Sequence, residues 1–321
     1  MNNIYVTAFQ SGGGSYGHKL SDIVSAYLFA EWLGAELLAH KTWHVPELKT
    51  FNISSGLRDY NEVNTETLTK HVSSQKTCYG MSLQSALRIR NRVMSIAQSR
   101  DVCLVLKLAS RIILSYMRNW YHRGKIDKDV YTQVLRDLRE RFYERNPEPT
   151  GRLGFADVRV ACFIRRAFMA YVREFPGNSF EFYSSLVDNV RKVLFGRSVR
   201  FTFFTQRDNS DDVERLADVP GVRLIYDGDY SDNMSDLVYS DVYVGSHSAS
   251  STWAAYFATG VVMVPTNGGQ ELPRTRGAMK RMDHVVYPDN FLPVEPDGSF
   301  DGVRLLDKLE TCGRANPIVL V

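Results

Sequence analysis

The chain has 321 residues, of which 44% are hydrophobic and 23% are charged, and its formal net charge is +3. This length allows one large or two medium domains with a substantial buried core, and the charge alone does not indicate a nucleic-acid or membrane-surface protein. The four cysteines are scattered without zinc-ligand spacing, and no stretch reaches the roughly 20 apolar residues of a membrane span. The opening residues lack the regions of a signal peptide, so a cytoplasmic protein is expected.

The N-terminal segment has the order of a Rossmann-like unit. Residues 4–9 form a β-branched apolar run, which predicts a strand. The glycine-rich stretch 11–18 follows, and its Gly13 and Gly14 allow the backbone to approach a ligand closely. Apolar residues then recur at helical spacing until Gly34, which marks the expected end of a helix.

Helical patterns dominate from there to about residue 145. The run 102–106 predicts one further strand, and 127–143 predicts a helix with a single apolar face. The proline-containing stretch 146–151 is the best candidate for a linker. We therefore expect an N-terminal domain at 1–150, with a helical insertion, and a C-terminal domain at 151–321.

The second half alternates regularly between strands and helices, which predicts an α/β fold whose parallel sheet carries helices on both faces. Ligands of such sheets bind at the carboxyl ends of the strands. The expected strands are 158–164, 199–204, 222–226, 242–244 and 261–264, and the expected helices lie near 179–194, 211–217, 234–239 and 250–258.

Polar residues follow three of these strands. Arg165 and Arg166 end the first, where a guanidinium suits a phosphate, although a surface ion pair is the alternative. The second strand runs into a cluster that suits a base or ribose, or an ordinary helix start, and it comprises Thr205, Gln206 and Arg207. Asp227 and Asp229 end the third strand with metal-ligand spacing, but Asp-Gly is also a common turn.

The strand at 242–244 is followed by the densest group of hydroxyl side chains. They stand at the start of a predicted helix, where hydroxyls and free N–H groups together favour a phosphate. A simple helix cap, which needs only one hydroxyl, is the alternative. The predicted donor-binding residues here are Ser246, His247, Ser248, Ser250, Ser251 and Thr252.

This segment resembles the donor site of the fucosyltransferase superfamily, which includes α-1,2-, α-1,6- and protein O-fucosyltransferases. The resemblance extends to the glycine loop with its helix and to residues 287–291, and residues 50–150 show none. It implies a GT-B architecture, with two Rossmann-like domains facing across a cleft, and a nucleotide-sugar donor linked to GDP or UDP. The matching strings are Ser240-Asp241-Val242-Tyr243-Val244-Gly245-Ser246 and Ser251-Thr252-Trp253-Ala254-Ala255.

One motif departs from the family pattern His-x-Arg-Arg-x-Asp. Arg165 and Arg166 match it, but Phe163 and Phe168 occupy the histidine and aspartate positions. By resemblance Arg165 contacts the diphosphate, and the sugar is fucose or a relative such as xylose. The resemblance also implies an inverting transfer to a glycan hydroxyl that needs no metal and no further cofactor.

The catalytic base should come from the N-terminal half. His18 suits proton transfer near neutral pH, and Asp22 and then His44 are its rivals. Three other functions stay open: a metal-dependent GT-A transferase that uses Asp227 and Asp229, a non-catalytic carbohydrate- or nucleotide-binding protein, and a dinucleotide oxidoreductase suggested by the glycine run.

Overall fold

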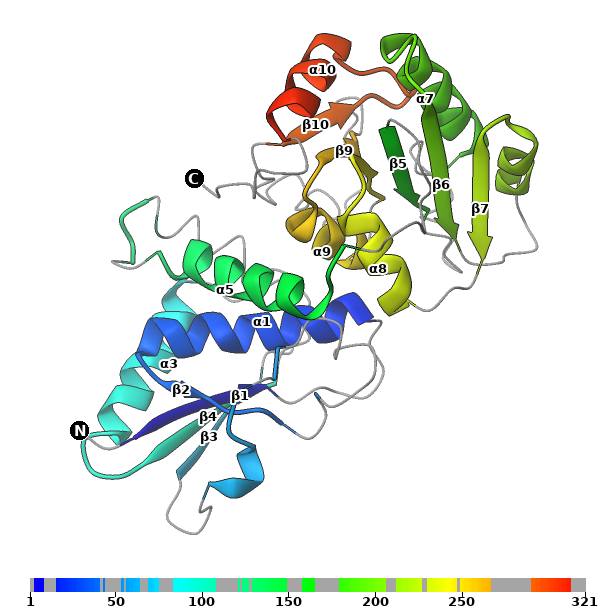
Figure 1. The fold of residues 1–321 in the computed structure, drawn as a ribbon. Helices are drawn as coiled ribbons and strands as arrows, with labels where there is room; N and C mark the ends of the chain where they lie inside the picture. The colour runs from blue at the N-terminus through cyan, green and yellow to red at the C-terminus, as the bar shows by residue number, and fades with distance from the viewer. Residues whose placement is uncertain are drawn as a thin grey trace. The chain divides into compact units, whose positions relative to one another are not determined.

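A computed structural model gives the fold, and the chain forms two compact units, Met1–Arg145 and Asn146–Val321. Each unit contains its own parallel sheet flanked by helices, which confirms the expected α/β class (Figure 1). The structure describes residues 3–8, 16–40, 43, 53–54, 56–63, 69–74, 83–107, 121, 123–126, 129–148, 158–164, 179–205, 212–226, 230–246, 249–266 and 290–312.

The first unit is built on a four-stranded parallel sheet in the order β2-β1-β4-β3. Its central strand β1 is buried along its whole length, and α1 packs against β1 and α5. The elements are β1 (Ile4–Ala8), α1 (Tyr16–Leu33), β2 (Glu36–Leu37), the 3₁₀ helix η2 (Tyr60–Glu62), β3 (Thr69–Ser74), α3 (Leu83–Ile96), β4 (Val102–Lys107) and α5 (Val130–Arg145).

The strongest sequence patterns of this unit are confirmed. Helix α1 ends at Gly34, whose φ of +63° is the left-handed conformation that glycine adopts readily. Helix α5 buries the face that its periodicity predicts, including Val134 and Leu138. Strand β3 was not predicted, because Thr-Lys-His-Val-Ser-Ser has no apolar alternation. It forms through continuous parallel pairing with β4.

The second unit has a six-stranded parallel sheet in the order β10-β9-β8-β5-β6-β7. Its elements are β5 (Val158–Phe163), α7 (Phe180–Val193), β6 (Val199–Thr205), the 3₁₀ helix η4 (Asp212–Asp218), β7 (Val222–Tyr226), α8 (Tyr230–Val238), β8 (Val242–Val244), α9 (Ala249–Phe257), β9 (Val261–Pro265), β10 (Phe291–Val294) and α10 (Gly302–Thr311).

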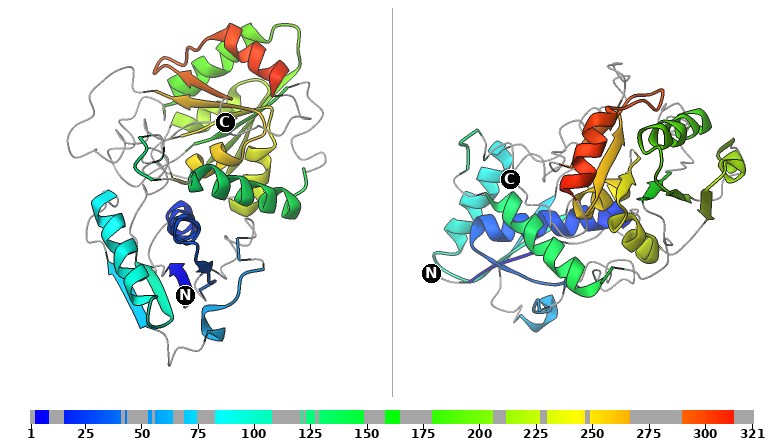
Figure 2. Two further views of the ribbon diagram at one scale, coloured as in Figure 1. Left: turned by 90° about the vertical axis from the view of Figure 1, so that its left-hand side faces the viewer. Right: turned by 45° about the horizontal axis from the view of Figure 1, so that its top comes forward.

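This strand order reverses direction at the middle of the sheet. From β5 the chain moves outward through β6 to β7, then returns to the other side of β5 and continues outward through β8, β9 and β10. Helix α7 contacts η4 and α10, while α8 contacts α9, so the helices form two groups, as right-handed crossovers on opposite faces require (Figure 2). The reversal point between β5 and β8 is where doubly wound sheets bind ligands.

Local signals explain most of these boundaries. The Ser179 hydroxyl accepts a hydrogen bond from the Phe182 N–H at 3.1 Å and caps α7, within the helix predicted at 179–194. Strand β10 was not predicted, because Pro293 interrupts its run. Proline is tolerated there because β10 forms the edge of the sheet in the described part of the chain, where it pairs with β9.

Candidate functional site

Three neighbouring strands, β5, β6 and β8, end at the same level along the carboxyl edge of the second sheet. Phe163 of β5 pairs with Phe204 of β6, and Cys162 pairs with Val244 of β8. By this register, Ile164, Thr205 and Ser246 stand side by side at the reversal point. Adjacent strands are about 4.8 Å apart, so Thr205 and Ser246 flank the end of β5 at a separation of roughly 10 Å. Arg165 is the next residue after Ile164 and lies outside the described residues.

Hydrogen bonds of Ser251 with Ser246 and Tyr243 close the loop between β8 and α9, and we call this group the Ser251 clasp. The Ser251 Oγ accepts a hydrogen bond from the Ser246 N–H at 2.7 Å and lies 2.7 Å from the Tyr243 hydroxyl. That hydroxyl also donates to the Ser251 carbonyl oxygen at 3.1 Å. Tyr243 and Ser251 are both buried. The Ser251 hydroxyl therefore holds the loop together, and its contact with a donor stays a prediction.

Gly245 and Ser246 stand inside this clasp. A Cβ at Gly245 would lie 2.9 Å from the Ser251 Oγ, so a side chain there would push the clasp apart. Ser246 is 5% exposed, and its own hydroxyl has no hydrogen-bond partner among the described residues. A buried hydroxyl without a partner costs free energy, which a ligand oxygen at this edge would recover.

The start of α9 adds N–H groups to the same edge. The helix begins at Ala249, immediately after the loop, and the first N–H groups of a helix have no partners within it. Of Ser250 and Thr252 the structure describes the backbone only. In the second unit, seven other predicted donor-site residues lie outside the described residues, and so does Asp227. The seven are Arg165, Arg166, Gln206, Arg207, Asp229, His247 and Ser248.

Helix α8 contributes buried polar residues that the sequence reading did not identify. It begins just beyond the carboxyl end of β7 and packs on β5 and α9. Asn233 and Asp236, one turn apart, are both buried on it. The Asn233 Oδ1 has no hydrogen-bond partner in the described part of the chain. Two polar side chains at helical spacing among Met234, Leu237 and Val238 are the signal that could have identified this pair.

In the first unit, Asp22 is the one proposed base whose side chain is described. It lies on α1, in the run 21–30, where every residue is buried. His18 lies in the first turn of the same helix, described by its backbone alone, while His44, Gly13 and Gly14 are outside the described residues. A further histidine, His40, was not predicted as a site residue and is buried where the chain folds over the end of β1. There the Trp43 Nε1 donates to the Ala8 carbonyl at 3.0 Å.

Comparison with known proteins gives distant structural likenesses alone. No protein-family model matches the chain, and no curated protein matches it. Among solved structures, the chain is similar to "Spinosyn Forosaminyltransferase SpnP", with a TM-score of 0.30 and 10% sequence identity. The match covers 97% of this chain and 90% of that one. At this score and identity the likeness identifies neither a family nor a substrate.

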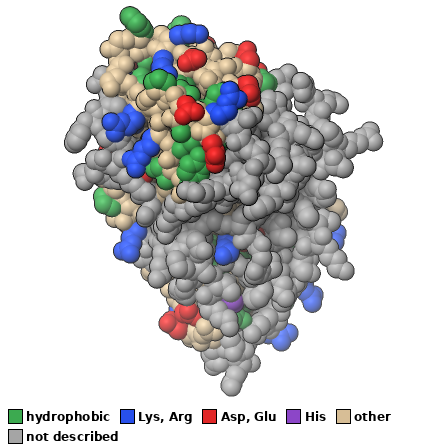
Figure 3. Space-filling model, turned by 90° about the vertical axis from the view of Figure 1, so that its right-hand side faces the viewer, with side chains coloured by type: hydrophobic (Ala, Val, Ile, Leu, Met, Phe, Trp, Pro, Cys, Tyr) green, Lys and Arg blue, Asp and Glu red, His purple; other side chains and the backbone are tan. Residues whose placement is uncertain are grey.

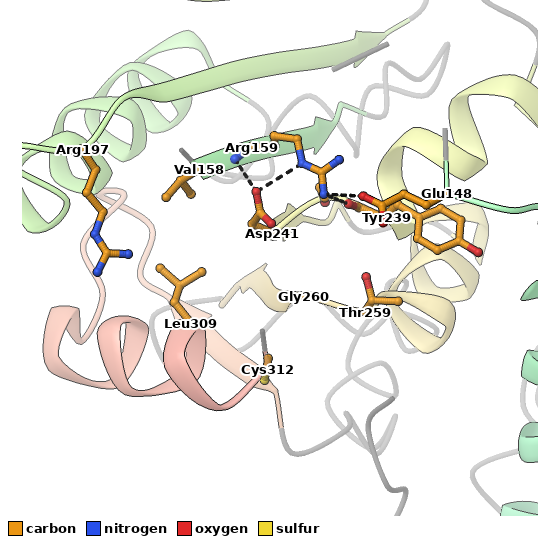
Figure 4. Close-up of a pocket in the computed structure, with 11 residues that line it drawn as sticks. Glu148, Val158, Arg159, Arg197, Tyr239, Asp241, Thr259, Gly260, Leu309 and Cys312 are labelled. Atoms are coloured by element: carbon orange, nitrogen blue, oxygen red, sulfur yellow. Dashed lines mark hydrogen bonds and ion pairs between the residues drawn. The ribbon is translucent and has the colours of Figure 1, made fainter. Parts of the chain in front are cut away.

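The opposite, amino-terminal edge of the second sheet holds a cavity of about 250 Å³ around a buried arginine (Figure 4). The Arg159 backbone N–H donates to Asp241 Oδ2 at 2.7 Å, and its Nε donates to the same oxygen at 3.3 Å. Its Nη2 donates to the Tyr239 carbonyl at 2.7 Å and lies 3.0 Å from Glu148 Oε1. These partners occupy the guanidinium, and the cavity is smaller than the roughly 300 Å³ at which ligand clefts usually begin. We interpret this cluster as structural.

The Cys162 side chain is fully buried in the second unit. Burial raises the pKa of the Cys162 thiol well above its usual range, which disfavours the reactive thiolate. Within the described ranges no group of three or more His, Cys, Asp or Glu side chains is arranged to hold a metal ion. In the same residues no helix has the length and apolar character needed to cross a membrane.

Proposed function

We propose that this protein is a glycosyltransferase that moves a sugar from a nucleoside-diphosphate donor to a hydroxyl group of a glycan. The donor binds at the carboxyl edge of the second sheet, between the ends of β5 and β8. The sugar is fucose or a relative such as xylose, linked to GDP or UDP, and the transfer inverts the anomeric centre without a metal ion.

The observation that carries the proposal is the reversal of strand order between β5 and β8. Most of the residues that resemble a nucleotide-sugar site follow these two strands, namely Arg165 and Arg166 after β5 and the segment 245–255 after β8. Ser246 adds a buried hydroxyl without a partner among the described residues, at the end of the loop that the Ser251 clasp holds. An oxygen-rich anion such as a diphosphate would satisfy that hydroxyl and the N–H groups at the start of α9.

In the proposed reaction the acceptor oxygen attacks the anomeric carbon as the bond from that carbon to the diphosphate breaks. The bonding electrons leave with the nucleoside diphosphate, which gains negative charge, while the sugar passes through an oxocarbenium-like state. Donors that hold the departing phosphate more tightly than the intact donor lower this barrier. Arg165 and the segment 246–252 are proposed for that role.

The acceptor hydroxyl must lose its proton to a base, which we propose to be a residue of the N-terminal half. His18 is the first candidate, because an imidazole accepts a proton at neutral pH. Asp22 is the second, one turn further along α1. The substitution His18→Ala should abolish transfer while donor affinity is retained, and the parallel variant Asp22→Asn tests the rival.

A screen of purified protein against GDP-, UDP- and dTDP-sugars tests the function. Thermal stabilisation and slow release of the diphosphate are measured with and without a strong chelator. The proposal predicts stabilisation by one nucleotide class and release that the chelator does not affect. Loss of activity with the chelator would favour the metal-dependent alternative at Asp227 and Asp229, and binding without release or transfer would favour a non-catalytic binding protein.

Two serines at opposite ends of β8 provide a matched pair of variants. Ser246→Ala should weaken nucleotide binding with little change in melting temperature, because its hydroxyl has no partner among the described residues to lose. The Ser240 hydroxyl instead donates to the Leu237 carbonyl at 2.8 Å, at the amino-terminal edge. Ser240→Ala should leave nucleotide affinity unchanged. Equal affinities in both variants would argue against a donor site beside Ser246.

A further inference from the structure

The turn that joins α7 to β6 holds a phenylalanine out in solvent. The Arg197 N–H donates to the Leu194 carbonyl at 3.0 Å, and Gly196 has a φ of +84°, as the third residue of a type II turn requires. Phe195 is the second residue of this turn and is 93% exposed. Leu194 beside it is buried and anchors the turn to the core. The backbone therefore fixes the phenylalanine ring in an outward position.

Helix α10 places a second apolar side chain at the same edge. Its first residue, Gly302, packs on α7, because a Cβ there would lie 2.7 Å from the Val193 Cγ2. The next residue, Val303, is 79% exposed. Val303 directly follows Gly302, and Phe195 is two residues beyond its partner Val193, so the contact between α7 and α10 brings the two exposed side chains to the same region. They lie at the amino-terminal edge of the second sheet, where β6 begins.

Basic residues are concentrated in the segment around Phe195. Residues 191–200 contain four basic residues and no acidic one, although the whole chain has a formal net charge of only +3. Lys192, Arg197 and Arg304 are exposed. Carboxylates also lie nearby: Asp188 is 3.9 Å from Arg191, Asp301 accepts the Arg304 N–H at 3.0 Å as the cap of α10, and Asp307 and Glu310 are exposed further along α10. On the face that carries α7 and β7, basic, acidic and hydrophobic side chains lie interspersed (Figure 3).

We propose that this turn patch, consisting of Phe195, Val303, Lys192, Arg197 and Arg304, docks the second unit on the surface of an anionic phospholipid bilayer. The phenylalanine ring enters the headgroup region, and the three cations face the lipid phosphates. Interfacial binding combines buried apolar area with electrostatic attraction to anionic lipids, and both components are present here.

Other partners fit the patch less well. Two apolar side chains offer far less than the roughly 800 Å² that each partner contributes to a standard protein interface. Single-stranded nucleic acids are bound through stacking on aromatic faces, and Val303 offers no such face. The patch lies at the edge opposite the proposed donor site, so its role does not depend on the proposed function.

Co-sedimentation with vesicles tests the proposal on the full chain. Vesicles of phosphatidylcholine alone are compared with vesicles that also contain phosphatidylglycerol. We expect binding only to the anionic vesicles, and that binding should weaken as salt screens the charges. Phe195→Ser should lower the partition coefficient about tenfold, since a largely buried aromatic ring contributes on that order. Lys192→Gln with Arg197→Gln and Arg304→Gln should lower it about fivefold per charge.

Exposed residues of the first unit provide matched controls. Tyr121→Ser removes an exposed aromatic ring, and Arg123→Gln removes an exposed cation. Neither should change vesicle binding, and all variants should keep the melting temperature of the parent protein. Equal binding to both kinds of vesicle, no binding to either, or undiminished binding by Phe195→Ser would overturn the proposal. The proposal would also be overturned if a single-stranded oligonucleotide bound the protein more strongly than the anionic vesicles and competed with them.

Discussion

Removing the Asp241 carboxylate should destabilise the second unit far more than removing the Glu148 carboxylate, although both contact Arg159. Asp241 holds the backbone N–H and the Nε of Arg159, and its side chain is 14% exposed. Glu148 holds the same guanidinium at 3.0 Å, but its side chain is 44% exposed. Breaking a buried pair leaves an uncompensated charge and costs about 3–5 kcal/mol. An exposed partner contributes about 0–1 kcal/mol.

We expect the lower end of the first range for Asp241→Ala, about 3 kcal/mol, because Arg159 keeps Glu148 and the Tyr239 carbonyl. For a unit of this size, that corresponds to a fall in melting temperature of about 6–12 °C. Asp241→Asn should fall between Asp241→Ala and the parent, because its amide oxygen still accepts the Arg159 backbone N–H but carries no charge.

Scanning calorimetry of the parent, Asp241→Ala, Asp241→Asn and Glu148→Ala measures these shifts, and nucleotide binding is followed in the same samples below their transitions. Asp241 belongs to the string that resembles a donor site, yet the structure places it at the amino-terminal edge. If Asp241→Ala lost nucleotide affinity while keeping the melting temperature of the parent, the structural role of Asp241 would be refuted.

Three further predictions concern Ser251, Gly260 and the reactivity of two cysteines. Ser251→Ala should cost about 1–3 kcal/mol of unfolding free energy, because it leaves the buried Ser246 N–H without its acceptor; a melting temperature equal to that of the parent would contradict the clasp. Gly260→Ala would drive a methyl group into the backbone carbonyls just before β8, so this variant should yield little folded protein, and normal yield and circular dichroism would count against the packing described. Cys162 should resist maleimide at mildly alkaline pH in the native protein, because burial raises the pKa of its thiol. The partly exposed Cys312 should react, and mass spectrometry of the labelled peptides distinguishes the two cysteines.

The elements that could be predicted from sequence are those whose signals are local. Strand β8 matches its predicted bounds because three buried residues stand between Asp241 and Gly245, and α7 carries its own cap at Ser179. Strands β3 and β10 were missed because their stability comes from a neighbouring strand that is distant in sequence. The strand order could not be read from the sequence, because pairing between distant strands leaves no local pattern.

Some residues of the candidate site could likewise be predicted from local signals, and others could not. Its residues follow strand ends, and strand ends can be predicted, so Thr205 and Ser246 could be named in advance and the structure sets them on either side of β5. The separate roles of Ser246 and Ser251 could not be predicted. They depend on Tyr243, whose hydroxyl meets Ser251 within the folded loop. The buried Asn233 has a local signal in its helical spacing with Asp236, but its burial depends on the packing of α8 against β5 and α9, which the sequence does not show.

Hydrogen exchange with and without a nucleoside diphosphate tests the central claim most directly, because it shows which edge of the second sheet binds the ligand. The account predicts that GDP or UDP slows exchange in peptides that cover the end of β5 and the segment 245–256. Exchange in peptides at the amino-terminal edge, including 191–200 and 239–242, should not change. Protection around Arg159 and Asp241 instead, or no protection by either nucleotide, would contradict a donor site between β5 and β8.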